Sequence, residues 1–167
     1  RQLVQGHIKI HDPESGAVFV NKRNAIHYEN MSIALAESVA NQGQGFISSM
    51  AFGNGGTSVD PTGIITYLTP NSTGTNASLY NQTFTKIVDD RSVSNLDPQR
   101  NKIETRHVNG TNYTDVVVTC LLDYGEPNGQ DATDTASASD SLYVFDELGL
   151  VSYASSGTGK LLTHVIF

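Results

Sequence analysis

The chain contains one glycine-rich stretch of the kind that binds phosphate groups in many enzymes. In AFGNGGTS the glycines are Gly53, Gly55 and Gly56. A phosphate-binding loop places such glycines directly before a helix, whose first backbone amides hold the anion. Here a proline, another glycine and β-branched residues follow, and no lysine stands at the Walker spacing. The stretch therefore predicts a turn or closely packed loop that precedes a strand near residues 64–68 and binds no nucleotide.

Histidine side chains could supply metal ligands. The five histidines are His7, His11, His27, His107 and His164. His7 and His11 lie on a predicted strand, where four residues span about 13 Å, which is too far for both to bind one ion. The sequence has no H-E-x-x-H pattern or other close ligand pair. The histidines therefore predict no metal site.

Acidic residues are concentrated in the segment 123–147, which has seven of them and no lysine or arginine. We interpret the segment as a solvated loop surface. A cation site and an acidic face that docks on a basic neighbour remain open as alternatives. The stretch DATDT lacks the residue pattern of a calcium-binding loop.

The sequence shows no clear set of residues for nucleophilic or acid–base catalysis. No G-x-S-x-G elbow is present, and the adjacent Asp89 and Asp90 would point to opposite faces of a strand. Cys120 is the only cysteine and lies in the apolar run DVVVTCLL, which predicts a buried, inert thiol. The sequence therefore predicts no catalytic, cofactor-binding or metal-binding residue, and no enzyme activity.

The size and charge of the chain limit the classes of protein to which it can belong. Its 167 residues suit one domain with a sizeable core. Ten basic and 17 acidic residues give a net charge of −7, which argues against nucleic acid or an anionic membrane as the main partner. We expect one domain over residues 1–167, truncated at its C-terminal end, because LLTHVIF is still strand-like where the sequence stops.

Strand-like patterns dominate the chain. GHIKIHD and AVFVNK alternate apolar and polar residues around the turn DPESG, which predicts an N-terminal hairpin. Further strand candidates are GIITYLT, QTFTKIV, KIETRHV, YTDVVVTCLL, SLYVFDELGL and KLLTHVIF. Many short strands separated by polar turns predict a mainly β fold, an antiparallel β-sandwich of jelly-roll-like type.

One stretch has helical periodicity. Met31, Leu35 and Val39 recur every four residues in YENMSIALAESVANQG. This pattern predicts a helix of about three turns near residues 30–41, capped by Asn30, with its apolar stripe facing a sheet.

Four stretches, taken together, carry a family resemblance. They are GHIKIHDPESGAVFVNKRNAIHYENM, FGNGGTSVDPTGIITYLTPN, VTCLLDYGEPNGQ, and YVFDELGL with LLTHVIF. Together they resemble an uncharacterised family of virion structural proteins from tailed bacteriophages of the marine and cyanophage type. The resemblance extends from about Gly6 to Phe167. It implies a β-rich protein located in the virion and brings no known catalytic residues.

These observations lead to an expected function. We expect a structural component of a tailed-phage virion, either a capsid decoration protein or a neck, collar or tail-baseplate protein. Its expected partners are other virion proteins and copies of itself in a homo-oligomer, with no nucleic acid and no membrane. The N-terminal RQLVQGHIKI and the C-terminal LLTHVIF are expected to be exposed strand edges that pair with a neighbour.

Two other classes of function remain as alternatives. A carbohydrate-binding module of a phage appendage is favoured by aromatic and amide residues in predicted loops, namely Tyr80, Tyr113 and Asn112. A glycan hydrolase needs two carboxylates that face one cleft. The sequence nominates no such pair.

Overall fold

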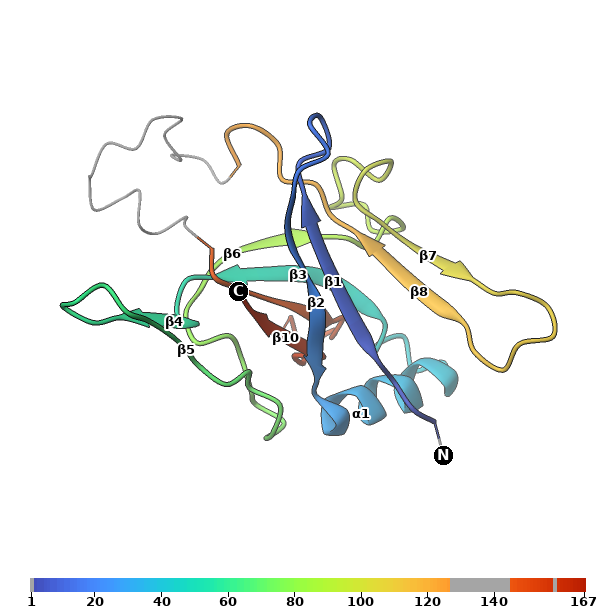
Figure 1. Ribbon diagram of the computed structural model, residues 1–167. Helices are drawn as coiled ribbons and strands as arrows, with labels where there is room; N and C mark the ends of the chain where they lie inside the picture. Colours follow the sequence, from blue (N-terminus) through green and yellow to red (C-terminus); the bar gives the residue numbers. More distant parts are fainter. Residues whose placement is uncertain (1, 127–144, 158) are drawn as a thin grey trace.

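The computed structural model describes residues 2–126, 145–157 and 159–167. It is mainly β: a six-stranded antiparallel sheet in the order β1-β2-β10-β9-β3-β6, two separate two-stranded hairpins, and the helix α1. The six-stranded sheet curls, and the hairpins extend from it (Figure 1). This sandwich-like arrangement confirms the predicted fold class. No helix in the described part of the chain has the length and apolar character needed to cross a membrane.

The elements have the following bounds. The curled sheet consists of β1 (Gly6–His11), β2 (Val18–Ile26), β3 (Ile47–Gly53), β6 (Gln82–Ile87), β9 (Glu147–Ser152) and β10 (Thr163–Ile166). The hairpins are β4 (Thr57–Val59) with β5 (Ile65–Tyr67), and β7 (Lys102–Arg106) with β8 (Asp115–Thr119). The helix is α1 (Tyr28–Val39).

The N-terminal hairpin forms as predicted. β1 and β2 pair antiparallel, and β1 is an edge strand of the sheet. Asp12 shapes the turn between them: its carboxylate accepts hydrogen bonds from the Glu14 amide and the Ser15 hydroxyl. Gly16 supplies the positive φ of 75° that the turn needs.

The C-terminal strand contradicts its prediction. β10 lies inside the sheet between β2 and β9, and all four of its residues are buried. The expectation that LLTHVIF forms an exposed edge is therefore wrong. The two polar residues of β10, Thr163 and His164, are hydrogen-bonded inside the protein to the Leu150 amide and to Glu147, which allows the strand to be buried on both faces.

The helix also differs from the prediction. It begins at Tyr28, and its N-cap is His27, whose Nδ1 accepts a hydrogen bond from the Asn30 amide at 3.1 Å. Asn30 is therefore not the cap. Its side chain is buried, and its Nδ2 donates to the carbonyl oxygen of Leu161 at 3.0 Å.

The face of α1 that packs on the sheet is not the predicted stripe. Leu35 and Val39 are 46% and 86% exposed, whereas Asn30 and Ala34 are buried. The hydrogen bond from Asn30 to Leu161 turns this side of the helix inward. The small side chain of Ala34 lets the backbone of the helix approach its neighbours.

The core occupies both faces of the sheet. Ala51 and Phe52 are neighbours on β3 and point to opposite faces, because side chains alternate along a strand. Ala51 packs with Leu79 and Leu161. On the other face, Phe52 belongs to a cluster with Leu148, Val165, Phe84, Cys120, Leu122 and Phe145. Segments outside the sheet therefore cover each face, which makes the fold sandwich-like.

Candidate functional site

The glycine-rich loop binds carboxylates of the protein itself. The Gly55 amide donates to Oε1 of Glu147 at 3.2 Å, and the Gly56 amide donates to Oδ1 of Asp146 at 2.9 Å. The Thr57 amide donates to Oδ2 of Asp146 at 3.0 Å. The loop amides thus hold two carboxylates of the chain itself. We call Asp146, Glu147 and their amide partners the carboxylate clasp.

Glu147 is the buried centre of the clasp. Its side chain is fully buried, and Oε1 also accepts a hydrogen bond from the Asn81 amide at 2.8 Å. Oε2 accepts from the Tyr80 amide at 3.0 Å and from Nε2 of His164 at 2.9 Å. Burial raises the pKa of Glu147, but the hydrogen bonds from His164 and the three amides lower it by more. The net pKa lies below the ordinary value, so the carboxylate is charged at neutral pH.

His164 uses both ring nitrogens inside the protein. Nδ1 accepts the Asn71 amide at 2.7 Å, so Nε2 carries the proton that is donated to Glu147. Neither side chain of the pair has any exposed surface. The pair therefore ties together chain segments inside the protein. Among the described residues, no group of three or more His, Cys, Asp and Glu side chains is placed to hold a metal ion.

The glycines of the glycine-rich stretch are required for space. A Cβ at Gly53 would lie 2.3 Å from the Asn81 carbonyl oxygen and 2.5 Å from Oε1 of Glu147. A Cβ at Gly55 would lie 2.8 Å from the Asn81 nitrogen. These two glycines are not among the residues with positive φ. The predicted close packing is confirmed, but Gly53 is the last residue of β3 and does not lie in the loop. The predicted strand near residues 64–68 is β5, and the shorter β4 precedes it.

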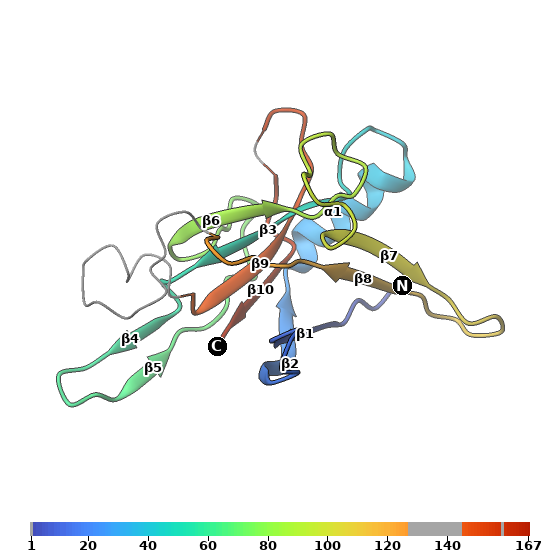
Figure 2. The same ribbon diagram turned by 90° about the horizontal axis from the view of Figure 1, so that it is seen from above.

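The clasp holds the root of the β4–β5 hairpin, which we call the arm (residues 57–67). Asp146 accepts both the amide and the hydroxyl of Thr57, the first residue of the arm. Beyond its last residue, the Leu68 amide donates to the Gly56 carbonyl at 2.9 Å. The arm extends away from the six-stranded sheet in both views (Figures 1 and 2). The glycine-rich loop thus anchors a projecting element.

The tip of the arm is an ordered turn built on Asp60. Its Oδ1 accepts hydrogen bonds from the Thr62 amide and the Ile64 amide, both at 2.9 Å. Gly63 follows with a φ of 85°. The hydrogen bonds from the Thr62 hydroxyl and the Ile64 amide lower the pKa of Asp60. The tip is therefore structured and negatively charged at neutral pH.

The two faces of the arm differ in chemistry. Cross-strand pairs are Thr57 with Tyr67, Ser58 with Thr66, and Val59 with Ile65. Since side chains alternate along a strand, one face carries Val59, Ile65 and Tyr67, while the other carries Ser58 and Thr66. Ile64 and Leu68 flank β5 on the side of Thr66 and are 63% and 38% exposed. The three large side chains of the first face are 64%, 53% and 59% exposed, respectively. The arm therefore presents an apolar face to solvent.

A groove at the root of the arm continues this apolar surface. It has a volume of about 800 Å³ and includes Ile10, Phe19, Phe52, Tyr67, Phe145 and Phe167 in its lining. Lys22 is the charged residue of the lining. Because Tyr67 belongs both to the arm and to this aromatic groove, the two form one continuous surface.

The β7–β8 hairpin is a second projecting element. It points away from the sheet on the side opposite to the arm (Figures 1 and 2). Val108, Tyr113 and Val116 expose 66%, 61% and 56% of their surface. This hairpin therefore also offers apolar side chains to solvent.

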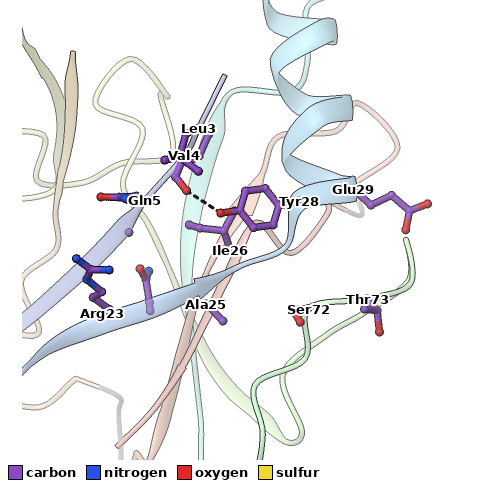
Figure 3. A pocket seen from close by; sticks show the side chains of 12 residues that line it. Leu3, Val4, Gln5, Arg23, Ala25, Ile26, Tyr28, Glu29, Ser72 and Thr73 are labelled. Atoms are coloured by element: carbon purple, nitrogen blue, oxygen red, sulfur yellow. Dashed lines mark hydrogen bonds between the residues drawn. The ribbon is translucent and has the colours of Figure 1, made fainter. Parts of the chain in front are cut away.

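A separate pocket of about 720 Å³ lies beside the N-terminus of α1 (Figure 3). Its lining includes Gln5, Arg23, Tyr28 and Thr73, which come from four different segments. The Tyr28 hydroxyl donates to the Val4 carbonyl at 3.0 Å, and the residue is 55% exposed. The pocket therefore combines an aromatic ring with polar groups. It is formed by segments far apart in the sequence, and sequence reasoning missed it.

The predicted carbohydrate-binding residues do not form one site. The Tyr80 hydroxyl donates to the Thr69 carbonyl at 2.6 Å, and its ring packs against His164. Tyr113 and Asn112 lie in the loop of the β7–β8 hairpin.

The described acidic residues of the segment 123–147 form ion pairs and hydrogen bonds with other residues of the chain. Asp123 pairs with Arg100 at 3.0 Å, and Glu126 pairs with Lys86. Asp146 and Glu147 belong to the clasp. The remaining acidic residues of the segment, Asp131, Asp134 and Asp140, lie outside the described residues.

Cys120 has the chemistry of an inert thiol. It packs on the Phe52 side of the sheet, and burial raises its pKa to about 11. Since the thiolate is the reactive form, we expect iodoacetamide at pH 7.5 to modify it at least about 100-fold more slowly than a free cysteine of pKa near 8.5. Mass spectrometry of the alkylated protein measures this rate, with the urea-unfolded chain as control. Equal rates in the folded and unfolded states would contradict the prediction.

The described surface thus offers two projecting hairpins, an aromatic groove and a mixed polar pocket. The titratable pair with the strongest internal hydrogen bonding, Glu147 with His164, is closed to solvent. Comparisons of the chain with protein-family models, with curated proteins and with solved structures found no match.

Proposed function

We propose that this protein is a structural component of a tailed-bacteriophage virion that acts through protein–protein assembly. It is either a capsid decoration protein or a protein of the neck, collar or tail baseplate. We assign it no enzymatic activity and no cofactor. The sequence resemblance supports a location in the virion. The single observation that carries the assembly role is the β4–β5 arm, whose apolar face is uncovered.

The energetics of a hairpin favour this role. An isolated two-stranded hairpin is at best marginally stable in water, and it gains stability when a third layer packs on its apolar face. The arm has such a face in Val59, Ile65 and Tyr67. Soluble monomers rarely expose apolar patches larger than a few hundred Å². The arm is therefore suited to insertion against a neighbouring subunit.

The β7–β8 hairpin supports contact with more than one neighbour. The two hairpins extend in different directions from one sheet (Figures 1 and 2). A subunit with separate contact elements on two sides fits a repeated array, in which each copy touches several others. The proposed partners are copies of this chain and other virion proteins.

Quantitative mass spectrometry of purified virions tests the proposed function. The protein should co-purify with the particles through a density gradient. Tens to hundreds of copies per particle support a capsid decoration protein, and a small fixed number supports a ring in the neck, collar or baseplate. A protein that is abundant in the infected-cell lysate but missing from purified particles overturns the proposal.

A second candidate function is carbohydrate binding by a phage appendage. The pocket beside α1 favours it, because an exposed Tyr28 ring lies with polar side chains in a volume typical of ligand sites. A glycan array tests this function. Binding that is lost in Tyr28→Ala and kept in Tyr113→Ala would support the pocket. No binding to any glycan would eliminate it.

A further inference from the structure

We propose that two copies of this chain exchange their β4–β5 arms across a two-fold axis. The apolar face of each arm packs on the arm and aromatic groove of the other copy, and Asp60 at each tip meets Lys22 at the other root. This inference rests on the proposed function, because it names a second copy as the partner of the arm.

The exposed apolar surface supplies a substantial part of the area that a dimer needs. Phe19 and Tyr67 are 69% and 59% exposed, and Val59 and Ile65 are also more than half exposed. A large aromatic side chain offers 150–250 Å², so these four residues expose roughly 400 Å² per copy. One partner of a standard interface contributes about 800 Å². These four residues therefore supply about half of that share.

The distribution of charge favours a second copy. The chain has a net charge of −7, so most contacts between copies bring acidic surfaces together. The arm, by contrast, carries only Asp60, and the lining of the groove carries only Lys22. Contact between the arm of one copy and the groove of another therefore joins opposite charges with no like-charge pair.

Both charged groups retain hydrogen-bonding capacity. All the hydrogen bonds that the Asp60 side chain accepts from described residues reach Oδ1, so Oδ2 has none from them. Nζ of Lys22 donates to the Ile166 carbonyl at 2.6 Å and has two further N–H groups. Three hydrogen bonds hold the Asp60 carboxylate and one holds the Lys22 ammonium, and each group has capacity for another.

The geometry of the arm explains why the exchange is symmetric. When two identical hairpins cross antiparallel, the tip of each lies at the root of the other. The root of this arm carries Tyr67, which also lines the groove that contains Lys22. Tip and root therefore carry complementary features, as an isologous interface requires.

Sedimentation velocity of the full chain tests the apolar contact. We expect a dimer for the wild type. Ile65→Glu places a charge on the apolar face and should raise the dimer dissociation constant at least about 100-fold, because the carboxylate is buried without a partner. Thr66→Glu, one residue along on the opposite face of the arm, is the matched control and should stay dimeric. Circular dichroism confirms that each variant is folded.

A double-mutant cycle tests the charged contact. Asp60→Asn keeps Oδ1 as an acceptor for the turn but removes the charge. Asp60→Asn and Lys22→Gln should each weaken the dimer about 10-fold, and the double variant should be little weaker than either single one. Effects that multiply would show that the two residues do not meet and would overturn the Asp60–Lys22 contact.

Failure of this inference is distinguishable from failure of the proposed function. A monomeric wild type, or equal weakening by Ile65→Glu and Thr66→Glu, overturns arm exchange even if the protein is found in purified virions. An arm-dependent dimer that is missing from virions supports arm exchange and overturns the proposed function.

Discussion

Replacing Glu147 with glutamine is expected to lower the free energy of unfolding by about 2–6 kcal/mol. The carboxylate accepts two N–H donors on each oxygen: Gly55 and Asn81 on Oε1, Tyr80 and His164 on Oε2. A glutamine has one oxygen, so in either orientation two donors lose their acceptor and face an NH₂ group. The His164 hydrogen bond is buried, and the three amide hydrogen bonds are partly buried. Each buried donor without an acceptor costs about 1–3 kcal/mol. Urea unfolding at a fixed protein concentration measures the loss.

The control for this prediction is Glu126→Gln. Glu126 also pairs with a basic group, Lys86, but its side chain is 36% exposed. A partly exposed ion pair contributes about 0–1 kcal/mol, so this variant should remain close to the wild type. A Glu147→Gln protein that unfolds within 1 kcal/mol of the wild type would contradict the role assigned to the clasp.

The effect of Glu147 on stability should depend on pH. Because the pKa of Glu147 is lower in the folded protein, the folded state favours the charged carboxylate. This contribution is fully present above the unfolded-state pKa and disappears as the pH falls through the folded-state pKa. The difference in stability between the wild type and Glu147→Gln should therefore be constant near pH 7 and shrink in acid. A difference that grows in acid would contradict the assigned direction.

The second large effect is expected for Gly53→Ala. A Cβ at this position would approach the Asn81 carbonyl oxygen to 2.3 Å and the clasp carboxylate to 2.5 Å. The obstacle is backbone, which moves only with the whole segment that leads into β6. Overpacking of this kind costs about 1–3 kcal/mol. Thermal or urea unfolding of the variant measures the cost.

Gly56→Ala provides a graded comparison. Its Cβ would meet side-chain atoms of Ile166 at 3.0 and 3.1 Å, and these can shift by a small rotation. We expect it to be less destabilising than Gly53→Ala. The reverse order would show that the close approach at Gly53 does not set the local structure.

Local patterns in the sequence were enough to predict much of the secondary structure. Alternation and turn residues identified the β1–β2 hairpin, and β-branched runs identified β6, β7 and β8. They did not identify β3, because ISSMAFG contains two serines and does not alternate. The residues after the glycines oppose a helix, which argues against a phosphate-binding loop. This left close packing as the reason for the glycines, and that prediction was correct.

Features that depend on contacts between residues far apart in the chain could not be predicted from local sequence patterns. The clasp joins Gly55 to Glu147 across 92 positions, and no local pattern connects them. The orientation of α1 depends on the contact of Asn30 with Leu161, 131 positions away. The exposed face of the arm became evident only when the pairing of Val59 with Ile65 was known.

Cryo-electron microscopy of the intact virion would show whether the β4–β5 arm mediates assembly. We expect density for this chain at symmetry-repeated positions, with the apolar face of the β4–β5 arm buried against a neighbouring copy. In such a map, Ile65 should be covered and Thr66 should face away from the contact. A map in which the chain is absent, or in which the arm projects into solvent with Ile65 uncovered, would contradict the account.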